Sequence, residues 1–290
     1  MNTQLSHFLQ LGLAIVVMSS SGTLGRYIDM SPPVTIWVRC VIGAVALYAV
    51  LKVFGIDTSP GSRRNYGSLI LSALLLGAHW VTYFFALQYS NVAIGMLALF
   101  TYPVMTALLE PIILKTPFQK LSIVLAIVAF AGVAMLVPEL TFENNFTFGI
   151  TLGVLSALFY SLRNIMLKKK VSGQSGITLM FYQLLVISLV LWPVLFLEES
   201  SFMTSFQANW QGILILGLFT TATGHTLFVL SFKNFSISTV SIISSLTPLI
   251  GIFLGYIFLN EVPAGKTLFG GFLIFITVIA ESIHSVRSSK

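Results

Sequence analysis

Apolar residues are collected along this chain into ten long stretches, with short polar segments between them. Each stretch has the roughly 17 to 25 residues that an α-helix needs to cross the hydrocarbon core of a bilayer. The pattern therefore predicts an all-α membrane protein with ten transmembrane helices and no soluble domain between them. The stretches are Phe8–Gly25, Val34–Phe54, Tyr66–Tyr89, Val92–Leu114, Leu121–Val137, Gly149–Leu167, Ile177–Leu197, Trp210–Phe232, Ile237–Leu259 and Thr267–Ile283.

Composition supports a lipid environment for most of the surface. Hydrophobic residues make up 56% of the 290 residues and charged residues 8%, whereas soluble domains carry about 25% charged residues. The net charge of +6 comes from basic residues that are scattered between apolar runs and do not form the patch typical of a nucleic-acid-binding protein. We therefore expect the lipid bilayer as a partner, and we do not expect nucleic acid.

Basic residues alternate between the connections in the way that sets membrane orientation. With a cytoplasmic N-terminus, eleven Lys and Arg residues fall on the inner side and two, Arg26 and Lys266, on the outer side. Ten crossings return the C-terminus to the inner side. Because the sequence shows no organelle-targeting signal, we expect a multi-pass protein of the plasma (inner) membrane with both termini in the cytoplasm.

Two prolines mark matching places in the two halves of the chain. Pro103 and Pro248 are 145 residues apart, and each lies in the middle of an apolar stretch. A proline interrupts the backbone hydrogen bonding of a membrane helix, and matched interruptions in two halves point to the binding site and the gating helices of a transporter. Because five crossings per half is an odd number, the second half enters the membrane from the opposite side. We predict two inverted five-helix repeats, residues 1–140 and 141–290.

Short motifs near these prolines resemble those of a known family. The first half reads Ala-Leu-Gln-Tyr-Ser-Asn-Val-Ala over 86–93 and Thr-Tyr-Pro over 101–103, and the second half reads Leu-Thr-Pro over 246–248 and Asn-Glu over 260–261. With Arg39 early in the second stretch, the chain resembles the EamA-type carriers of the drug/metabolite transporter superfamily. The resemblance implies two EamA-like five-helix repeats around a central cavity. It also implies a carrier of small metabolites, often an exporter of amino acids or related compounds.

Polar and aromatic side chains in the third and fourth stretches are the first candidates for the cavity wall. His79 lies near the middle of its stretch, with Trp80 beside it and Tyr83 one turn further along. Tyr102 precedes the first of the two prolines. Polar groups at membrane depth are expensive and mark functional sites. An imidazole with aromatic walls suits a zwitterionic or aromatic solute, while a histidine bonded to a neighbouring helix carbonyl is the alternative.

Further candidates lie in the second, sixth and eighth stretches. Arg39 has two open interpretations, in which it either extends to the lipid headgroups or binds a carboxylate through its two parallel donors. Arg163, at the inner end of its stretch, is expected to be a solvated positive cap. His225 follows a run of small and hydroxyl residues, for which helix packing is the alternative to cavity lining. Tyr160 and Asn164 are polar enough to face a cavity, although the pattern does not fix the rotation of their helix.

These observations favour a secondary transporter that moves a small organic metabolite, an amino acid or a related compound, by alternating access, with export as the expected direction. A nucleotide-sugar or sugar-phosphate carrier of the same architecture is the nearer alternative, and it predicts more than one cation at mid-membrane depth. A membrane-embedded enzyme is the more distant one, because the spans hold no paired acids or HxxxH motif. We predict no catalytic residues, no cofactor and no metal, and the oligomeric state stays open.

Overall fold

The computed structural model describes residues 3–59, 66–115, 118, 120–136, 144–170, 175–198, 202–231, 234–235, 240 and 243–288. All of the regular elements in these ranges are helical, which confirms the predicted all-α class. In chain order the elements are α1 Thr3–Tyr27, α2 Pro32–Val53, α3 Tyr66–Tyr89, α4 Val92–Leu99, α5 Tyr102–Leu114, α6 Lys120–Leu136, α7 Asn145–Lys170, α8 Gly176–Leu191, η2 Trp192–Glu198, α9 Phe202–Ile215, η3 Leu216–His225, α10 Thr226–Ser231, α12 Leu246–Leu259 and α13 Gly265–Ser288.

Seven helical segments in the described ranges are long and apolar enough to cross a membrane. Two shorter apolar helices, α6 and α12, have 17 and 14 residues. Helix α13 is amphipathic and has 24 residues. The seven segments are Leu5–Tyr27, Pro32–Val53, Tyr66–Tyr89, Val92–Leu114, Asn145–Met166, Gly176–Phe196 and Phe202–Ser231. They identify an integral, multi-pass membrane protein, while ten crossings in two inverted repeats stay a prediction.

The fourth apolar stretch is an interrupted helix. Helix α4 ends at Leu99 and α5 starts at Tyr102, so that Pro103 lies in the first turn of α5, where its missing N–H has no helical partner to lose. Pro248 likewise lies in the first turn of α12, directly after a turn at Ser245. Of the stretch that precedes Pro248, residues 236–239 and 241–242 lie outside the described part.

The eighth stretch departs from regular α-helix. Between α9 and α10, the segment η3 is a π-helix of 10 residues. Within it, the Thr221 hydroxyl donates to the Leu216 carbonyl five residues earlier, at 2.8 Å. A π-helical segment this long is rare and is found mostly at functional sites. The sequence motif of small and hydroxyl residues predicted helix packing at this place but gave no indication of the changed helical repeat.

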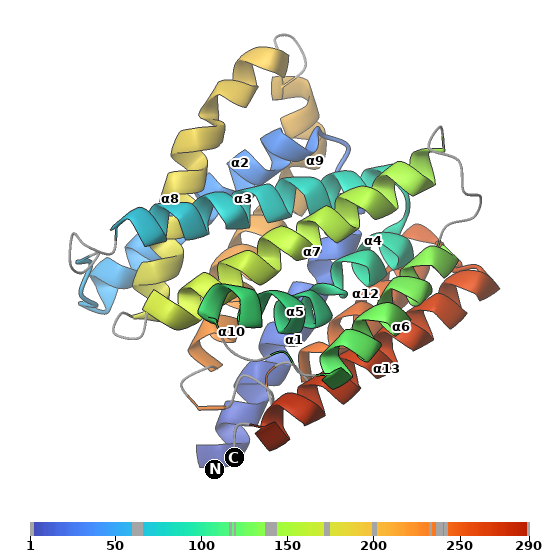
Figure 1. Ribbon diagram of the computed structural model, residues 1–290. Helices are drawn as coiled ribbons and strands as arrows, with labels where there is room; N and C mark the ends of the chain where they lie inside the picture. Colours follow the sequence, from blue (N-terminus) through green and yellow to red (C-terminus); the bar gives the residue numbers. More distant parts are fainter. Residues whose placement is uncertain are drawn as a thin grey trace.

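Long helices lie side by side through the body of the protein (Figure 1). Helix α3 packs along α7, α2 along α8, α1 along α12, and α6 along α13. Helices α6 and α13 approach closely because two glycines face each other: a Cβ at Gly132 would lie 2.8 Å from the Gly270 carbonyl oxygen. Two glycines of α12, four residues apart, also pack inside the chain, Gly251 against Met96 and Gly255 against Val92.

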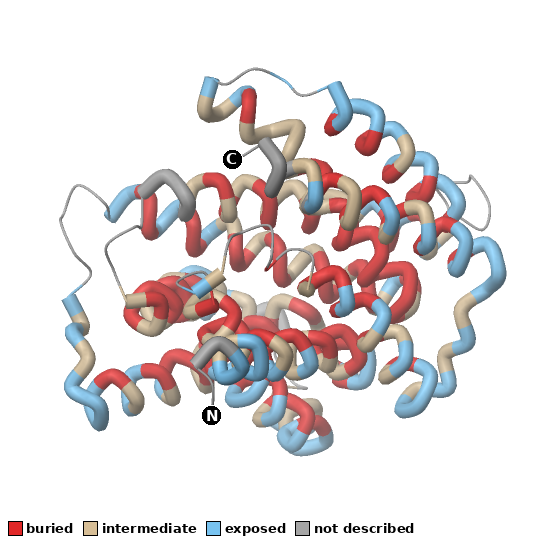
Figure 2. The backbone as a smooth tube through the Cα atoms, turned by 90° about the horizontal axis from the view of Figure 1, so that it is seen from below, coloured by how far each residue is buried: buried red, intermediate tan, exposed pale blue. Residues whose placement is uncertain are grey.

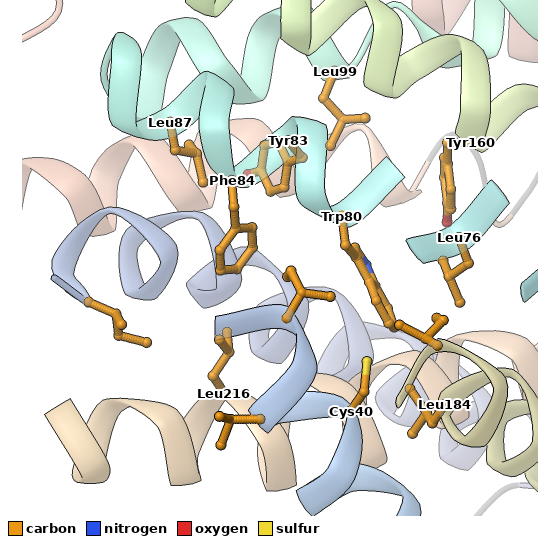
Figure 3. Close-up of a cluster of buried hydrophobic side chains, with 14 of the residues drawn as sticks. Cys40, Leu76, Trp80, Tyr83, Phe84, Leu87, Leu99, Tyr160, Leu184 and Leu216 are labelled. Carbon is orange, nitrogen blue, oxygen red and sulfur yellow. The ribbon is translucent and has the colours of Figure 1, made fainter. Parts of the chain in front are cut away.

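The outer surface is apolar and the interior is both apolar and polar. Exposed residues line the outside of the bundle and buried ones its inside (Figure 2), and exposed side chains such as Val45, Ile127 and Phe258 are 65%, 66% and 68% accessible. This arrangement is that of a lipid-facing surface. The largest buried cluster contains Trp80, Phe84 and other side chains from α2, α3, α7, α8 and η3 (Figure 3).

Candidate functional site

His79 occupies the middle of α3 and is 4% exposed. Its Nδ1 lies 2.7 Å from the Ser156 hydroxyl on α7, and that hydroxyl donates to the His79 backbone carbonyl at 2.8 Å. A serine has one proton to donate, so the imidazole must supply the proton of the other contact. Nδ1 therefore carries hydrogen, and in a neutral ring Nε2 is an acceptor. Within the described part of the chain, the ring hydrogen bond of His79 is made by Nδ1.

Aromatic rings enclose this imidazole. Tyr160 of α7 stacks on His79 with ring centroids 4.5 Å apart, and Tyr83, one helical turn away, lies at 6.2 Å. Tyr102, at the start of α5, meets Tyr160 edge-on at 4.8 Å. The helix interruption before Pro103 thus places Tyr102 against the same wall, where the Ser161 hydroxyl donates to its backbone carbonyl at 2.9 Å.

Arg39 lies beside the aromatic wall and is completely buried, so it does not extend to the lipid headgroups. Its guanidinium carbon is 4.6 Å from the ring centroid of Trp80 and 5.3 Å from that of Phe84, within cation–π distance. Two hydroxyls of the π-helix accept its hydrogen bonds, Thr221 from Nε at 2.8 Å and Thr220 from Nη2 at 3.3 Å. The guanidinium is therefore held by neutral groups and a ring face.

Arg163 contradicts its sequence prediction. It is 3% exposed and is not a solvated cap. From α7 it donates through Nη2 to the Gln183 side-chain oxygen on α8 at 2.8 Å and through Nη1 to the Asn164 side-chain oxygen at 3.2 Å. Its guanidinium carbon lies 6.0 Å from the Tyr160 ring centroid. The charge was misplaced because the following lysines, residues 168–170, suggested a helix end, whereas α7 turns the Arg163 side chain inward.

The predicted residues thus fall into one connected cluster. His79, Tyr83, Tyr102 and Tyr160 form the aromatic wall described above. Trp80 links it to Arg39 and also meets His225 of η3 edge-on at 5.1 Å. Asn164 joins the cluster through Arg163. The structure brings these side chains together but leaves their contact with a substrate as a prediction.

Sequence reasoning missed the small polar partners of the cluster. Ser156, Thr220 and Thr221 hold His79 and Arg39, and Ser72 accepts from the Gln183 side-chain nitrogen at 2.9 Å. Isolated serines, threonines and glutamines in apolar stretches most often bond their own backbone, so their sequence carries no distinguishing signal. In the described ranges no group of three or more His, Cys, Asp and Glu side chains is arranged to hold a metal ion.

A separate cavity of about 590 Å³ opens at one end of the bundle. It is lined by residues of the α1–α2 connection, by Gln88 at the end of α3 and by Ser205 on α9. Arg26 also lines it, and its Nε forms an ion pair with Glu261 at 3.2 Å. Glu261 in turn accepts from the Val92 backbone N–H at 2.8 Å, so the carboxylate joins the ends of α12, α1 and α4.

Comparison with known families decides the class of this protein. The EamA-like transporter family matches the chain twice, over residues 7–137 and 147–281. The chain belongs to the EamA-like transporter family. This match confirms the resemblance drawn from the short motifs, and membership of the family implies a small-molecule substrate.

Individual relatives are more distant. The chain is 22% identical over 247 residues to the pseudopaline exporter of Pseudomonas aeruginosa, covering 85% of this chain and 84% of the relative. It is 24% identical over 273 residues to the S-adenosylmethionine uptake transporter of Rickettsia conorii, covering 92% and 89%. A protein of known crystal structure aligns with a TM-score of 0.69 at 15% identity, over 98% of this chain and 99% of that one, and shows the same fold.

Proposed function

We propose that this protein is a secondary transporter that moves a small organic metabolite across the membrane by alternating access. Two inverted five-helix repeats, residues 1–140 and 141–290, rock around a site at mid-membrane depth. The observation that carries the proposal is the buried cluster of Arg39, His79, Trp80 and Tyr160, because polar groups at such depth are costly and mark substrate pathways.

Helix packing supports the inverted repeat. If each element of the first half is matched with one of the second (α1 with α7, α2 with α8, α3 with α9–η3–α10, α4–α5 with α12, and α6 with α13), the contacts exchange in pairs. The α3–α7 contact corresponds to the contact of α1 with η3 and α10, and the α1–α12 contact to that of α4 and α5 with α7. The α2–α8, α4–α12 and α6–α13 contacts correspond to themselves. A two-fold relation between the halves requires this exchange.

The interrupted helices support it at the level of single residues. Helices α5 and α12 each carry a proline in the first turn, and each ends at a residue with left-handed backbone: Lys115 has φ 57° and Asn260 has φ 54°. These two residues are 145 positions apart, as are Pro103 and Pro248.

The start of α1 and the end of α13 also lie at the same lower end of the bundle (Figure 1), as ten crossings require. In the orientation that the basic residues favour, both termini lie in the cytoplasm and the membrane is the plasma (inner) membrane.

The cluster suits an amino acid or a related compound. Nε2 of His79 is an acceptor for an ammonium group, Arg39 is a donor pair for a carboxylate, and the rings of Trp80, Tyr83 and Tyr102 receive the apolar part of the solute. Tyr160, Asn164 and His225 complete the wall, and the interruptions at Pro103 and Pro248 provide the moving joints. Export is the proposed direction, as in the similar pseudopaline exporter, although another relative is named for uptake.

Two different classes remain as rivals. The proposal of a sugar-phosphate or nucleotide-sugar carrier gains support from the burial of both Arg163 and Arg39, because such a carrier needs more than one buried cation. The cluster gives no support to a membrane-embedded enzyme, since neither of its imidazoles, His79 and His225, has a neighbouring carboxylate in the described part to form an acid–base pair.

The test is solute flux with the purified full-length protein in liposomes. Proteoliposomes preloaded with an unlabelled amino acid mixture should accumulate labelled amino acid from outside, with saturation and at carrier turnover rates. A parallel set preloaded with sugar phosphates tests the first rival. Absence of counterflow in both sets, or unsaturable ion currents, would rule out the proposed carrier.

A further inference from the structure

Arg163 is a buried cation with no ion pair to a carboxylate among the described residues. Taking a guanidinium out of water costs several kcal/mol, which an adjacent carboxylate normally offsets. Neither Arg163 nor Arg39 forms an ion pair with a carboxylate in the part of the chain that the structure describes, where the Arg26–Glu261 pair lies at the cavity end of the bundle. In the described part of the interior, these two positive charges are supported by neutral hydrogen-bond acceptors and aromatic ring faces.

The hydrogen bonds of Arg163 are incomplete as well. A guanidinium has five N–H donors. Gln183 and Asn164 accept from Nη2 and Nη1, and the Met180 sulfur lies 3.9 Å from Nη2. Nε is buried and has no acceptor among the described residues. An unsatisfied charged donor of this kind costs more than an unmade neutral hydrogen bond, so the arrangement is understandable if the missing acceptor arrives with a ligand.

The surroundings of Arg163 are built across three helices. Gln183 accepts from Arg163 and donates to Ser72, which ties α7 to α8 and α8 to α3. The ring centroid of Tyr160 lies 6.0 Å from the guanidinium carbon of Arg163, and the same ring stacks on His79. The residue after His79 is Trp80, and the Arg39 guanidinium lies over its ring face. Figure 3 shows Trp80 and Tyr160 entering the same buried cluster. The two cations thus contact rings of the same buried cluster, Arg39 at Trp80 and Arg163 at Tyr160.

We propose that Arg163, positioned by Gln183 and Ser72, binds a second acidic group of the transported compound, while Arg39 binds the first. The substrate class is a small organic diacid, an amino acid or a related compound, whose second acidic group is a carboxylate or a phosphate ester. The inference rests on the proposed transport function and narrows it. A diacid bound across the wall neutralises both guanidiniums and supplies the acceptor that Nε lacks.

Paired probes test this on the purified full-length protein. Binding of L-glutamate is compared with that of L-glutamine, and binding of O-phosphoserine with that of serine, by the rise in melting temperature with ligand concentration. Each pair differs in its second acidic group alone. A charge-assisted bidentate hydrogen bond corresponds to roughly a 10- to 100-fold tighter binding of the acidic member. Preference for glutamate identifies a carboxylate and preference for O-phosphoserine a phosphate.

The variant Arg163→Gln should bind both members of the preferred pair equally, with the neutral member bound as in the unmodified protein. Arg39→Gln should weaken both members alike. Arg163→Lys, which keeps the charge but loses the planar donor pair, serves if the glutamine variant does not fold, and it should retain phosphate binding better than carboxylate binding. Lys52→Gln, the same charge change on an exposed residue, is the control and should alter neither.

The outcomes separate the two proposals. If Arg163→Gln keeps the preference while Arg39→Gln loses binding, the transport site stands and the second acidic position is wrong. If the unmodified protein binds glutamine and serine as tightly as their acidic partners, or binds neither acid, the diacid class is wrong while flux of another solute still supports the carrier. Absence of flux for every solute overturns the proposed function itself.

Discussion

Removal of the His79 side chain should strongly reduce transport and leave the protein folded. The variant His79→Ala lacks the neutral hydrogen bond of the ring to Ser156, worth about 1 kcal/mol, and the stacking of the ring on Tyr160, worth about 0.5–1.5 kcal/mol. The Ser156 hydroxyl is not left unsatisfied, because it still donates to the residue 79 carbonyl, 2.8 Å away in the structure. With a further cost for the void, the total is about 3–4 kcal/mol, which a bundle of this size tolerates.

The loss of transport is larger than the loss of stability suggests. If Nε2 accepts a hydrogen bond from the substrate ammonium, a charge-assisted bond of about 1.5–3 kcal/mol is removed. The affinity then falls roughly 10- to 150-fold. The assay is the initial rate of amino-acid counterflow into proteoliposomes, measured against substrate concentration. Thr151→Ala is the matched control, since its hydroxyl donates to the Thr147 carbonyl of its own helix, α7, and has no hydrogen bond to the cluster among the described contacts.

The same reasoning predicts the tautomer. ¹⁵N spectra of histidine-labelled protein should show His79 with hydrogen on Nδ1 and a bare Nε2. In Ser156→Ala the ring loses the oxygen that fixes this state, so the two tautomers should mix and transport should fall less than in His79→Ala. Unchanged counterflow in His79→Ala would remove His79 from the binding site. A protonated Nε2 with a bare Nδ1 in the unmodified protein would refute the geometric assignment.

Three further predictions concern packing, the cavity end and topology. Gly132→Ala should lower the melting temperature by several degrees, because its Cβ would lie 2.8 Å from a carbonyl oxygen of α13, an overpacking cost of about 1–3 kcal/mol. The control, Gly12→Ala, has no atom within 4 Å of the added Cβ and should be neutral or stabilising. Equal effects of the two substitutions would contradict the close contact between α6 and α13. Glu261→Gln should cost less than about 1 kcal/mol of stability, since its ion pair with Arg26 is partly exposed. It should nevertheless raise the rate of maleimide labelling of a Ser205→Cys reporter in the adjacent cavity. An unaltered labelling rate would show that the ion pair does not restrain this end of the bundle. Reporter tags at the two termini should both be cytoplasmic, and tags on opposite faces would refute ten crossings.

Much of the fold could be predicted because hydrophobic length is a direct physical requirement of a bilayer. The third stretch, Tyr66–Tyr89, coincides with α3 residue for residue, and Pro103 lies where one helix gives way to the next. The rotation of α7 was not predictable, since it depends on which face packs against α3. Arg163 was therefore placed at a solvated helix end although it is buried. The π-helix containing Thr221 was missed for a related reason, because its changed helical repeat leaves no regular spacing of apolar residues in the sequence.

The π-helix explains how the protein keeps a buried guanidinium without neutralising it. The hydroxyls of Thr220 and Thr221 both donate to the carbonyl of Leu216, at 2.6 and 2.8 Å. Each hydroxyl proton is thereby engaged by the backbone, so the oxygen lone pairs remain to accept from Arg39. A carboxylate in their place would hold the arginine more tightly but would also compete with an acidic substrate. Fixed hydroxyl dipoles lower the cost of the buried charge while leaving its field available, which is what reversible binding of an anionic group requires.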